Sequence, residues 1–163
     1  MWIAVLMAAW VAWLDQLTKA WIREAVPLHA SLPVWQNCFA VTYVKNTGAA
    51  WGMFNNHNEL LALLAVTMLV LLAVFRRKLL PRGRGGDVIL GLLVGGIVGN
   101  LLDRLRLAFV TDYLDFYVGH WHWPAFNIAD AAICAGVIFF MLLTWQGRSD
   151  EPAADMPAAP ENP

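Results

Sequence analysis

The sequence predicts a membrane-embedded all-α bundle of four transmembrane helices, with a small extracytoplasmic β-sheet and a short interfacial helix. Hydrophobic residues make up 60% of the 163 residues and charged residues only 14%, which is too apolar for an ordinary soluble domain. Long apolar segments alternate with short polar ones, and two of the polar segments contain β-prone stretches. The net charge of −1 gives no indication of nucleic-acid binding.

Four apolar segments approach the roughly 20 residues that a transmembrane helix needs. The predicted spans are residues 1–22, 60–75, 88–107 and 126–145. The first has no basic residue ahead of its apolar run, so we interpret it as a retained helix and not as a signal peptide. Residues 1–146 then form one integral membrane domain. The Pro-, Ala- and acid-rich tail, residues 147–163, is predicted to be disordered because it cannot bury a core.

Positive charge in short loops sets the predicted orientation. Five basic residues crowd the connection 76–87, which we therefore place in the cytoplasm. An even number of spans puts both termini, including the tail, on the same side. Residues 23–59 and 108–125 are then extracytoplasmic, and their many aromatic side chains suit the level of the lipid headgroups.

The two outer segments carry the predicted sheet and the interfacial helix. Side chains alternate along residues 39–44, and residues 109–118 are rich in Val, Thr, Tyr and Phe, so each predicts a strand. Between the first strand and the second span, residues 48–58 begin with a glycine-containing amphipathic run that can lie on the membrane surface. His120 and His122 alternate with tryptophans, a pattern that favours an aromatic belt over a metal pair.

Glycines recur at every fourth position of the third span, at Gly91, Gly95 and Gly99. Such a stripe allows close helix approach in lipid, and we expect it to serve packing inside one bundle more than a homodimer face. The apolar run of the fourth span contains Cys134, which we expect to be a small buried residue without a disulfide.

Charged side chains at membrane depth are costly and usually have a role. Asp15 and Lys19 lie four residues apart and can pair, either to orient the first helix or to contact a substrate. Asn100, Asp103 and Arg104 share a face near the outer end of the third span, where an interhelical hydrogen-bond network is expected.

Asp112 follows the third span and Asp130 lies in the first turns of the fourth, so both carboxylates reach the outer face from neighbouring helix ends. Two carboxylates around one water can hydrolyse a peptide bond without a covalent intermediate, since like charges at close range make one of them hold a proton. Other nucleophiles are scarce. Ser31 and Ser149 lie outside the spans, and neither a Gly-x-Ser-x-Gly nor a His-Glu-x-x-His motif is present.

At these positions the sequence resembles the lipoprotein signal peptidases, or signal peptidases II. Five blocks occur in the order of that family and extend from the first span to the fourth. They are Asp15-Gln16-Leu17-Thr18-Lys19, Asn46-Thr47-Gly48-Ala49-Ala50, Gly99-Asn100-Leu101-Leu102-Asp103-Arg104, Val110-Thr111-Asp112-Tyr113 and Pro124-Ala125-Phe126-Asn127-Ile128-Ala129-Asp130. One departure is Trp51, where the family commonly has Phe.

The resemblance implies an aspartic endopeptidase of the bacterial cytoplasmic (inner) membrane that uses no metal or other cofactor. We expect the protein to be a monomer. Its implied substrate is a prolipoprotein carrying a diacylglyceryl-modified cysteine in the lipid, cut just before that cysteine, and its implied inhibitor is globomycin. Asp112 and Asp130 match the catalytic pair. The implied substrate-binding positions are Asn46, Asn100, Arg104 and Asn127. The implied structural positions are Asp15, Lys19, Gly48, Gly96 and Asp103.

Two other functions fit the residues alone. An ion- or proton-coupled transporter uses buried aspartates as often as a peptidase does, although here the polar residues gather at one edge of the membrane. Ion flux in liposomes without proteolysis would favour the transporter. A non-enzymatic scaffold built on the glycine stripe would keep its function after loss of both carboxylates.

Overall fold

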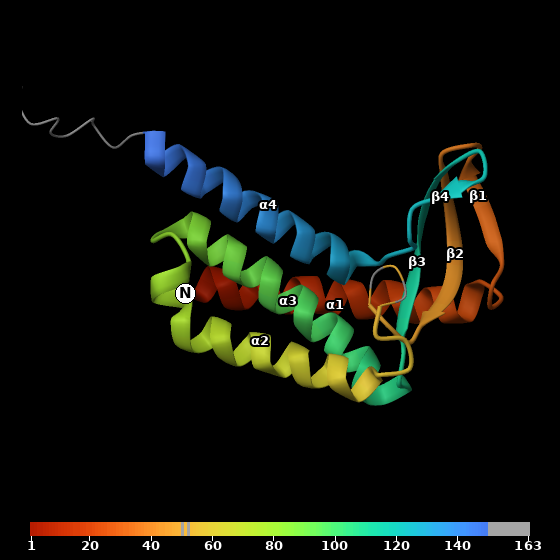
Figure 1. Ribbon diagram of the computed structural model, residues 1–163, viewed down its shortest axis with the longest axis horizontal. Coiled ribbons are helices and arrows are strands. Elements are labelled where there is room, and N and C mark those ends of the chain that lie inside the picture. The colour runs from red at the N-terminus through yellow and green to blue at the C-terminus, as the bar shows by residue number, and fades with distance from the viewer. Residues whose placement is uncertain (50, 52, 150–163) are drawn as a thin grey trace, which may run out of the picture.

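The computed structural model describes residues 1–49, 51 and 53–149, and it places a β-sheet at one end of a helical bundle (Figure 1). The helices are α1 (Trp2–Ala25), α2 (Asn58–Leu79), α3 (Arg84–Leu107) and α4 (Ile128–Ser149). The strands are β1 (Ser31–Trp35), β2 (Phe39–Asn46), β3 (Val110–Val118) and β4 (Trp121–His122). All four helices are long and apolar enough to cross a membrane, which confirms the predicted fold class.

The helices extend beyond the predicted spans where charged residues suit a helix end. α2 begins two residues before its predicted start and continues to Leu79, with Glu59 in its first turn and three basic residues in its last. These charges interact favourably with the helix dipole, so the end of the apolar run does not end the helix. α3 begins at Arg84, which leaves only residues 80–83 as the connection instead of 76–87. α4 includes residues 147–149, and the remainder of the predicted tail, 150–163, lies outside the described residues.

α3 is the central helix of the bundle, and its glycines allow the neighbouring helices to approach. A Cβ atom at Gly95 would lie 2.7 Å from Cβ of Val11 on α1. On the other side, a Cβ atom at Gly96 would lie 2.4 Å from the carbonyl oxygen of Ala129 on α4. The stripe therefore packs inside the bundle, as predicted.

The sheet is antiparallel with the order β1-β2-β3-β4. The two predicted strands are confirmed as β2 and β3. β1 and β4 were not predicted, because β1 contains Pro33 and is exposed along its whole length, while β4 has only two residues. A small core of Ile22, Val26, Tyr43 and Tyr113 joins the sheet to the end of α1.

Residues 48–58, where the interfacial helix is predicted, form a compact turn-rich loop in their described part. The Ala49 N–H donates to the carbonyl of Met53 (2.7 Å), and Phe54 and Asn56 have positive φ angles. Residues 50 and 52 of the predicted helix lie outside the described residues. The loop connects β2 to α2 at the end of the bundle that carries the sheet (Figure 1).

Candidate active site

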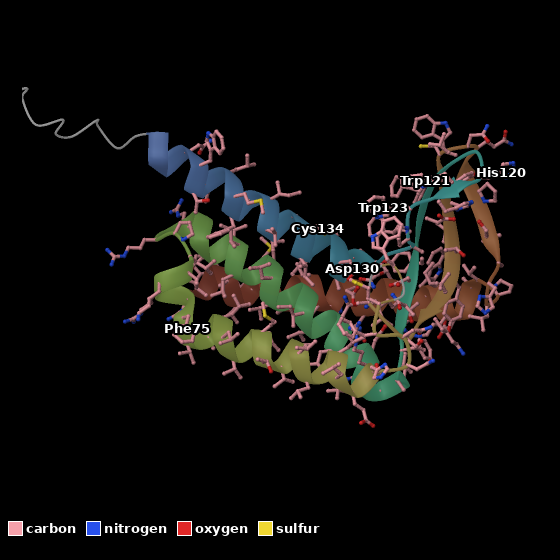
Figure 2. All side chains as sticks on the ribbon, viewed as in Figure 1. Phe75, His120, Trp121, Trp123, Asp130 and Cys134 are labelled. Atoms are coloured by element: carbon pink, nitrogen blue, oxygen red, sulfur yellow. The ribbon has the colours of Figure 1, made fainter. Side chains whose placement is uncertain are left out.

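The short connections between helices and strands bring Asp112 and Asp130 to one end of the bundle. Asp112 is the third residue of β3, which starts three residues after α3 ends, and Asp130 is the third residue of α4. Asn46 ends β2 and pairs in register with Val110 at the start of β3. In Figure 2, Asp130 lies where α4 meets the sheet.

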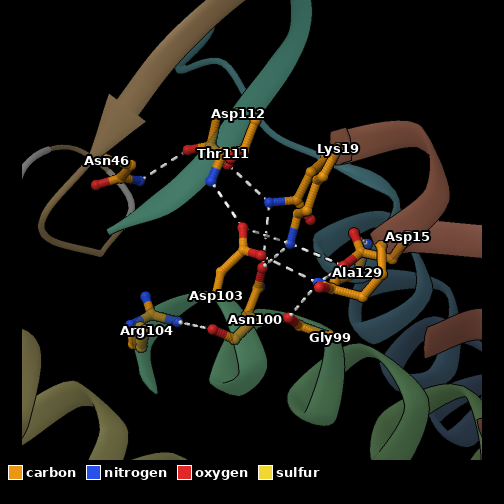
Figure 3. Close-up of polar contacts among 12 residues, drawn as sticks. Asp15, Lys19, Asn46, Gly99, Asn100, Asp103, Arg104, Thr111, Asp112 and Ala129 are labelled. Atoms are coloured by element: carbon orange, nitrogen blue, oxygen red, sulfur yellow. Dashed lines mark hydrogen bonds and ion pairs between the residues drawn. The ribbon is translucent and has the colours of Figure 1, made fainter. Parts of the chain in front are cut away.

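Asp112 accepts hydrogen bonds from two asparagine amides. Asn46 Nδ2 donates to its Oδ2 (2.8 Å), and Asn127 Nδ2 donates to its Oδ1 (2.7 Å). Both amides are held in this orientation by backbone N–H groups that donate to their oxygens, from Gly48 to Asn46 (2.9 Å) and from Asp130 to Asn127 (3.0 Å). Both amide groups therefore present N–H donors to the carboxylate, and Figure 3 shows the contact between Asn46 and Asp112.

Asp130 and Asn127 form a reciprocal cap at the start of α4. The Asn127 side chain accepts the Asp130 backbone N–H, while Asp130 Oδ2 accepts the Asn127 backbone N–H (3.3 Å). This is the capping-box arrangement, with Asp in the position that Glu or Gln usually holds. Asn100 Nδ2 donates to the other oxygen of Asp130 (2.7 Å). Asn127 thus contacts both aspartates and holds them on one side of the helix start.

Burial and charge place the titration of Asp112 near neutral pH. Its side chain is only 2% exposed, and this burial is the main reason that its pKa rises from 3.8 to about 7. The neighbouring charge of Asp130 raises the pKa further, while the amides of Asn46 and Asn127 partly oppose the rise. Two acidic groups arranged in this way can hold one proton between them.

A second buried cluster lies beside this pair and is centred on Lys19. Its ammonium group, fully buried, lies 2.8 Å from Asp15 Oδ2 and 3.5 Å from Asp103 Oδ2. It also donates to Asn100 Oδ1 (2.9 Å; Figure 3). The Asn100 amide nitrogen donates to Asp130. The predicted pair of Asp15 and Lys19 is therefore present, and it is linked through Asn100 to the aspartate pair.

The two carboxylates of this second cluster also receive backbone N–H groups. Asp15 Oδ1 accepts the N–H of Ala129 at the start of α4 (2.9 Å), and Asp103 Oδ2 accepts that of Thr111 on β3 (3.0 Å). A Cβ atom at Gly99 would lie 2.6 Å from Asp15 Oδ2, so only glycine leaves room for this carboxylate. The cluster ties α1, α3, α4 and β3 together.

The expectation that Asn100, Asp103 and Arg104 act on one face needs a correction. Asp103 points toward Lys19, whereas Arg104 Nη2 points the other way and donates to the carbonyl of Gly48 (3.2 Å). Adjacent helix positions differ by about 100° in direction, which separates them. Asn100 and Asp103 join the buried network around Lys19, whereas Arg104 lines a cavity and does not.

Sequence reasoning gave no role to Gln16, although its Nε2 donates to Asp103 Oδ1 and to the carbonyl of Gly99, both at 3.0 Å. The available signal was a further polar side chain beside Asp15 in an otherwise apolar helix.

The aspartate pair lines a cavity of about 760 Å³ between α3, α4, the sheet and the 48–58 loop. Asn46, Asn100 and Arg104 also line it, and Asn127 is buried behind its wall. At its mouth the rings of Trp51 and Trp123 meet edge-on, with centroids 5.5 Å apart. The cavity therefore combines acidic and amide groups with an aromatic rim.

Other predicted residues lie elsewhere or have different surroundings. Cys134 lines the cavity and is exposed, so the prediction that it is buried was wrong, because α4 turns this position outward. His122 contacts Asp115 (3.0 Å) on the sheet, away from the cavity. Among the described residues, no group of three or more His, Cys, Asp or Glu side chains is arranged to hold a metal ion.

Comparison with known proteins gives one consistent match. The family model described as signal peptidase (SPase) II matches residues 7–146. The lipoprotein signal peptidase of Syntrophotalea carbinolica is 42% identical over 88% of this chain and 91% of its own, and that of Nitratidesulfovibrio vulgaris is 38% identical over 89% and 90%. A solved bacterial membrane enzyme structure covers 94% of both chains, with a TM-score of 0.84 and 27% identity.

Proposed function

Because the chain belongs to the signal peptidase II family, we propose that it is a membrane aspartic endopeptidase that removes signal peptides from diacylglyceryl-modified bacterial prolipoproteins. The cut falls just before the lipidated cysteine. The observation that carries the proposal is the pair of Asp112, which is buried, and Asp130, which is half-buried, both held by asparagine amides in one cavity at the end of a membrane bundle.

In the proposed mechanism, a water molecule lies between the two carboxyl groups. The ionised carboxylate takes a proton from the water, and the water oxygen attacks the scissile carbonyl carbon. The protonated one hydrogen-bonds the carbonyl oxygen and stabilises the developing negative charge. Collapse of the tetrahedral intermediate breaks the C–N bond, and a carboxyl proton passes to the leaving amine of the cysteine. The pKa of about 7 for Asp112 supports a shared proton at neutral pH.

The neighbouring polar groups suit substrate binding. Asn46 and Arg104 line the cavity and can hold main-chain groups of an extended peptide, while Asn100 and Asn127 keep the carboxylates in place. Cys134 on α4 lines the cavity and is exposed at the surface of the helix bundle. The acyl chains can therefore stay in the lipid, which matters because each buried CH₂ contributes about 0.8 kcal/mol.

The proposed location is the bacterial cytoplasmic membrane, with both termini in the cytoplasm and the cavity at the extracytoplasmic face. The basic residues between positions 76 and 84 lie at the opposite end of the bundle from the sheet, which supports this orientation. We also expect a monomer, since the glycine stripe of α3 is occupied by α1 and α4 within the chain.

Cleavage of a diacylated prolipoprotein by the purified protein in lipid tests the proposal. Globomycin should inhibit the reaction. Asp112→Asn and Asp130→Asn should each lower the rate by about 10²–10⁴-fold, the usual contribution of general acid–base groups. Asp115→Asn is the matched control, because Asp115 is on the same strand but does not line the cavity. Retained cleavage in either of the first two variants would refute the assigned pair.

A further inference from the structure

A second cavity, of about 440 Å³, lies at the end of the bundle opposite to the sheet. It is formed by the end of α2, the turn 80–83, the start of α3 and Met1. The proposed peptidase reaction does not use this end of the molecule. In Figure 2 the labelled Phe75, one residue before the first arginine of the cavity, lies far from Asp130.

The basic residues of this region divide into two groups. Arg76, Arg77 and Arg82 line the cavity, whereas Lys78 and Arg84 do not. The acidic residue of the cavity wall, Asp87, forms an ion pair with the amino group of Met1. The cavity therefore has an excess of positive charge, and its three arginines come from the end of α2 and from the following turn.

The turn that carries Arg82 packs closely against the start of α3. Gly86 is buried, and a Cβ atom there would lie 1.8 Å from the carbonyl oxygen of Pro81. Gly83 has a φ of 93°, a conformation that favours glycine. These two glycines let the chain reverse tightly between α2 and α3, which keeps Arg82 on the same side as the arginines of α2.

We propose that this cavity binds the phosphate headgroup of an anionic phospholipid. Guanidinium groups bind phosphate through paired hydrogen bonds, and basic pockets between helices at the membrane surface suit such headgroups. The remaining wall is apolar, formed by Leu80, Pro81 and Leu90, and Phe75 is exposed on the adjoining helix face. A lipid uses both features, since its phosphate contacts the arginines while its glycerol and acyl chains contact the apolar surface.

Native mass spectrometry of the full chain in detergent, titrated with phosphatidylglycerol or phosphatidylcholine, tests the proposal. The test variant is Arg76→Gln/Arg82→Gln. The matched control is Lys78→Gln/Arg84→Gln, which removes the same charge from the same end of the molecule but from residues outside the cavity. We expect the test variant to bind phosphatidylglycerol about tenfold more weakly than the control variant, a typical loss for charge-assisted contacts.

Three results would overturn the proposal. Equally weakened binding of phosphatidylglycerol in both variants would show that the basic residues attract the lipid only by their total charge and not by contacts within the cavity. Equal affinity of the unmodified protein for phosphatidylcholine would remove the preference for an anionic lipid. Full competition by water-soluble glycerol phosphate would assign the cavity to a free phosphate. Retained cleavage of prolipoprotein in the test variant would show that the variant is folded, so failure here is separate from failure of the proposed peptidase function.

Discussion

Two pairs of carboxylates lie side by side at one end of the bundle, all buried except the half-buried Asp130, and they differ in what neutralises them. Asp15 and Asp103 share the ammonium group of Lys19. Asp112 and Asp130 are hydrogen-bonded by amide groups, and in the described part of the chain neither has a cation within ion-pair distance. The first pair is compensated by a cation in direct contact, whereas the second contacts neutral amides and interacts with Lys19 and Arg104 only at longer range.

This difference assigns a structural role to the first pair and a role in proton transfer to the second. A buried charge with a partner and full hydrogen bonding can stay ionised and hold elements together. A buried acid without a cation is poised between its two protonation states, which is what proton transfer requires. The two pairs use the same side chain, so their surroundings and not their residue type assign the roles. Four changes test this view, given from the largest expected effect to the smallest.

Removing the cation should turn the compensated pair into an uncompensated one. In Lys19→Met, two buried carboxylates lose their shared cation, and Asp103 keeps only the more distant Arg23 at 3.9 Å. Breaking a buried pair in this way costs about 3–5 kcal/mol of unfolding free energy. Denaturant titration in detergent micelles measures the loss. The double variant Asp15→Asn/Lys19→Met should recover part of it, because one of the stranded charges is gone. Unchanged stability of Lys19→Met would show that the cluster does not hold the bundle together.

Adding a cation should do the reverse to the proposed catalytic pair. Asn46 is half-buried at the cavity wall and contacts Asp112. A lysine in its place would lower the pKa of Asp112 and keep both acids ionised, so we expect cleavage to fall about 100-fold. Asn46→Ala is the control, since it removes the amide without adding charge and should lose less activity. A larger loss in Asn46→Ala would show that the amide, and not the missing cation, governs the site.

The shared proton predicts how activity and stability depend on pH. The pKa of Asp112 is about 7 in the folded protein, whereas a carboxyl group of an unfolded chain has a pKa near 3.8. Between these pH values the folded protein therefore binds more protons than the unfolded chain. Unfolding free energy should therefore fall as pH rises from about 4 to 7. The cleavage rate should fall about tenfold per pH unit above the pKa of the pair.

The same pH titration with Asp112→Asn separates these effects. The asparagine does not titrate, so the fall in unfolding free energy over this range should become smaller. A slope identical to that of the unmodified protein would assign the pH dependence to other groups.

The smallest effect is expected at Cys134, which lines the cavity but makes no charged contact with the aspartates. Cys134→Ala should change the unfolding free energy by no more than about 0.5 kcal/mol, as is usual for surface positions. The cleavage rate should change less than twofold. A loss comparable to that of Asn46→Lys would mean that the thiol itself takes part in the reaction.

The sequence predicted those elements of the fold whose burial produces a recognisable pattern in consecutive residues. Apolar length located all four helices, and alternation located β2 and β3. Helix ends were missed because charged residues such as Glu59 and Arg76 interrupt the apolar pattern while favouring the helix termini they occupy. β1 and β4 leave little local mark, because their pairing depends on a neighbouring strand and not on a buried face.

The proposed site was predictable as a set of residues but not as an arrangement. Asp112, Asp130 and the asparagines were all named from the sequence, yet the division of the polar residues into two networks was not. That division depends on which direction Asp103 and Arg104 take around α3, and on how Asn100 bridges Lys19 and Asp130. Such contacts join residues 30 to 84 positions apart and cannot be derived from spacing along one helix.

The hydrogen bond from the Ala129 N–H to Asp15 joins the first helix of the chain to the last. During synthesis α1 is made long before α4, so the hydrogen bond from Ala129 to Asp15 can form only after nearly the whole chain has entered the membrane. Asp130 arrives with that same final helix, one residue after Ala129. The proposed hydrolytic centre is therefore assembled last, and an unfinished chain in the membrane carries no competent protease.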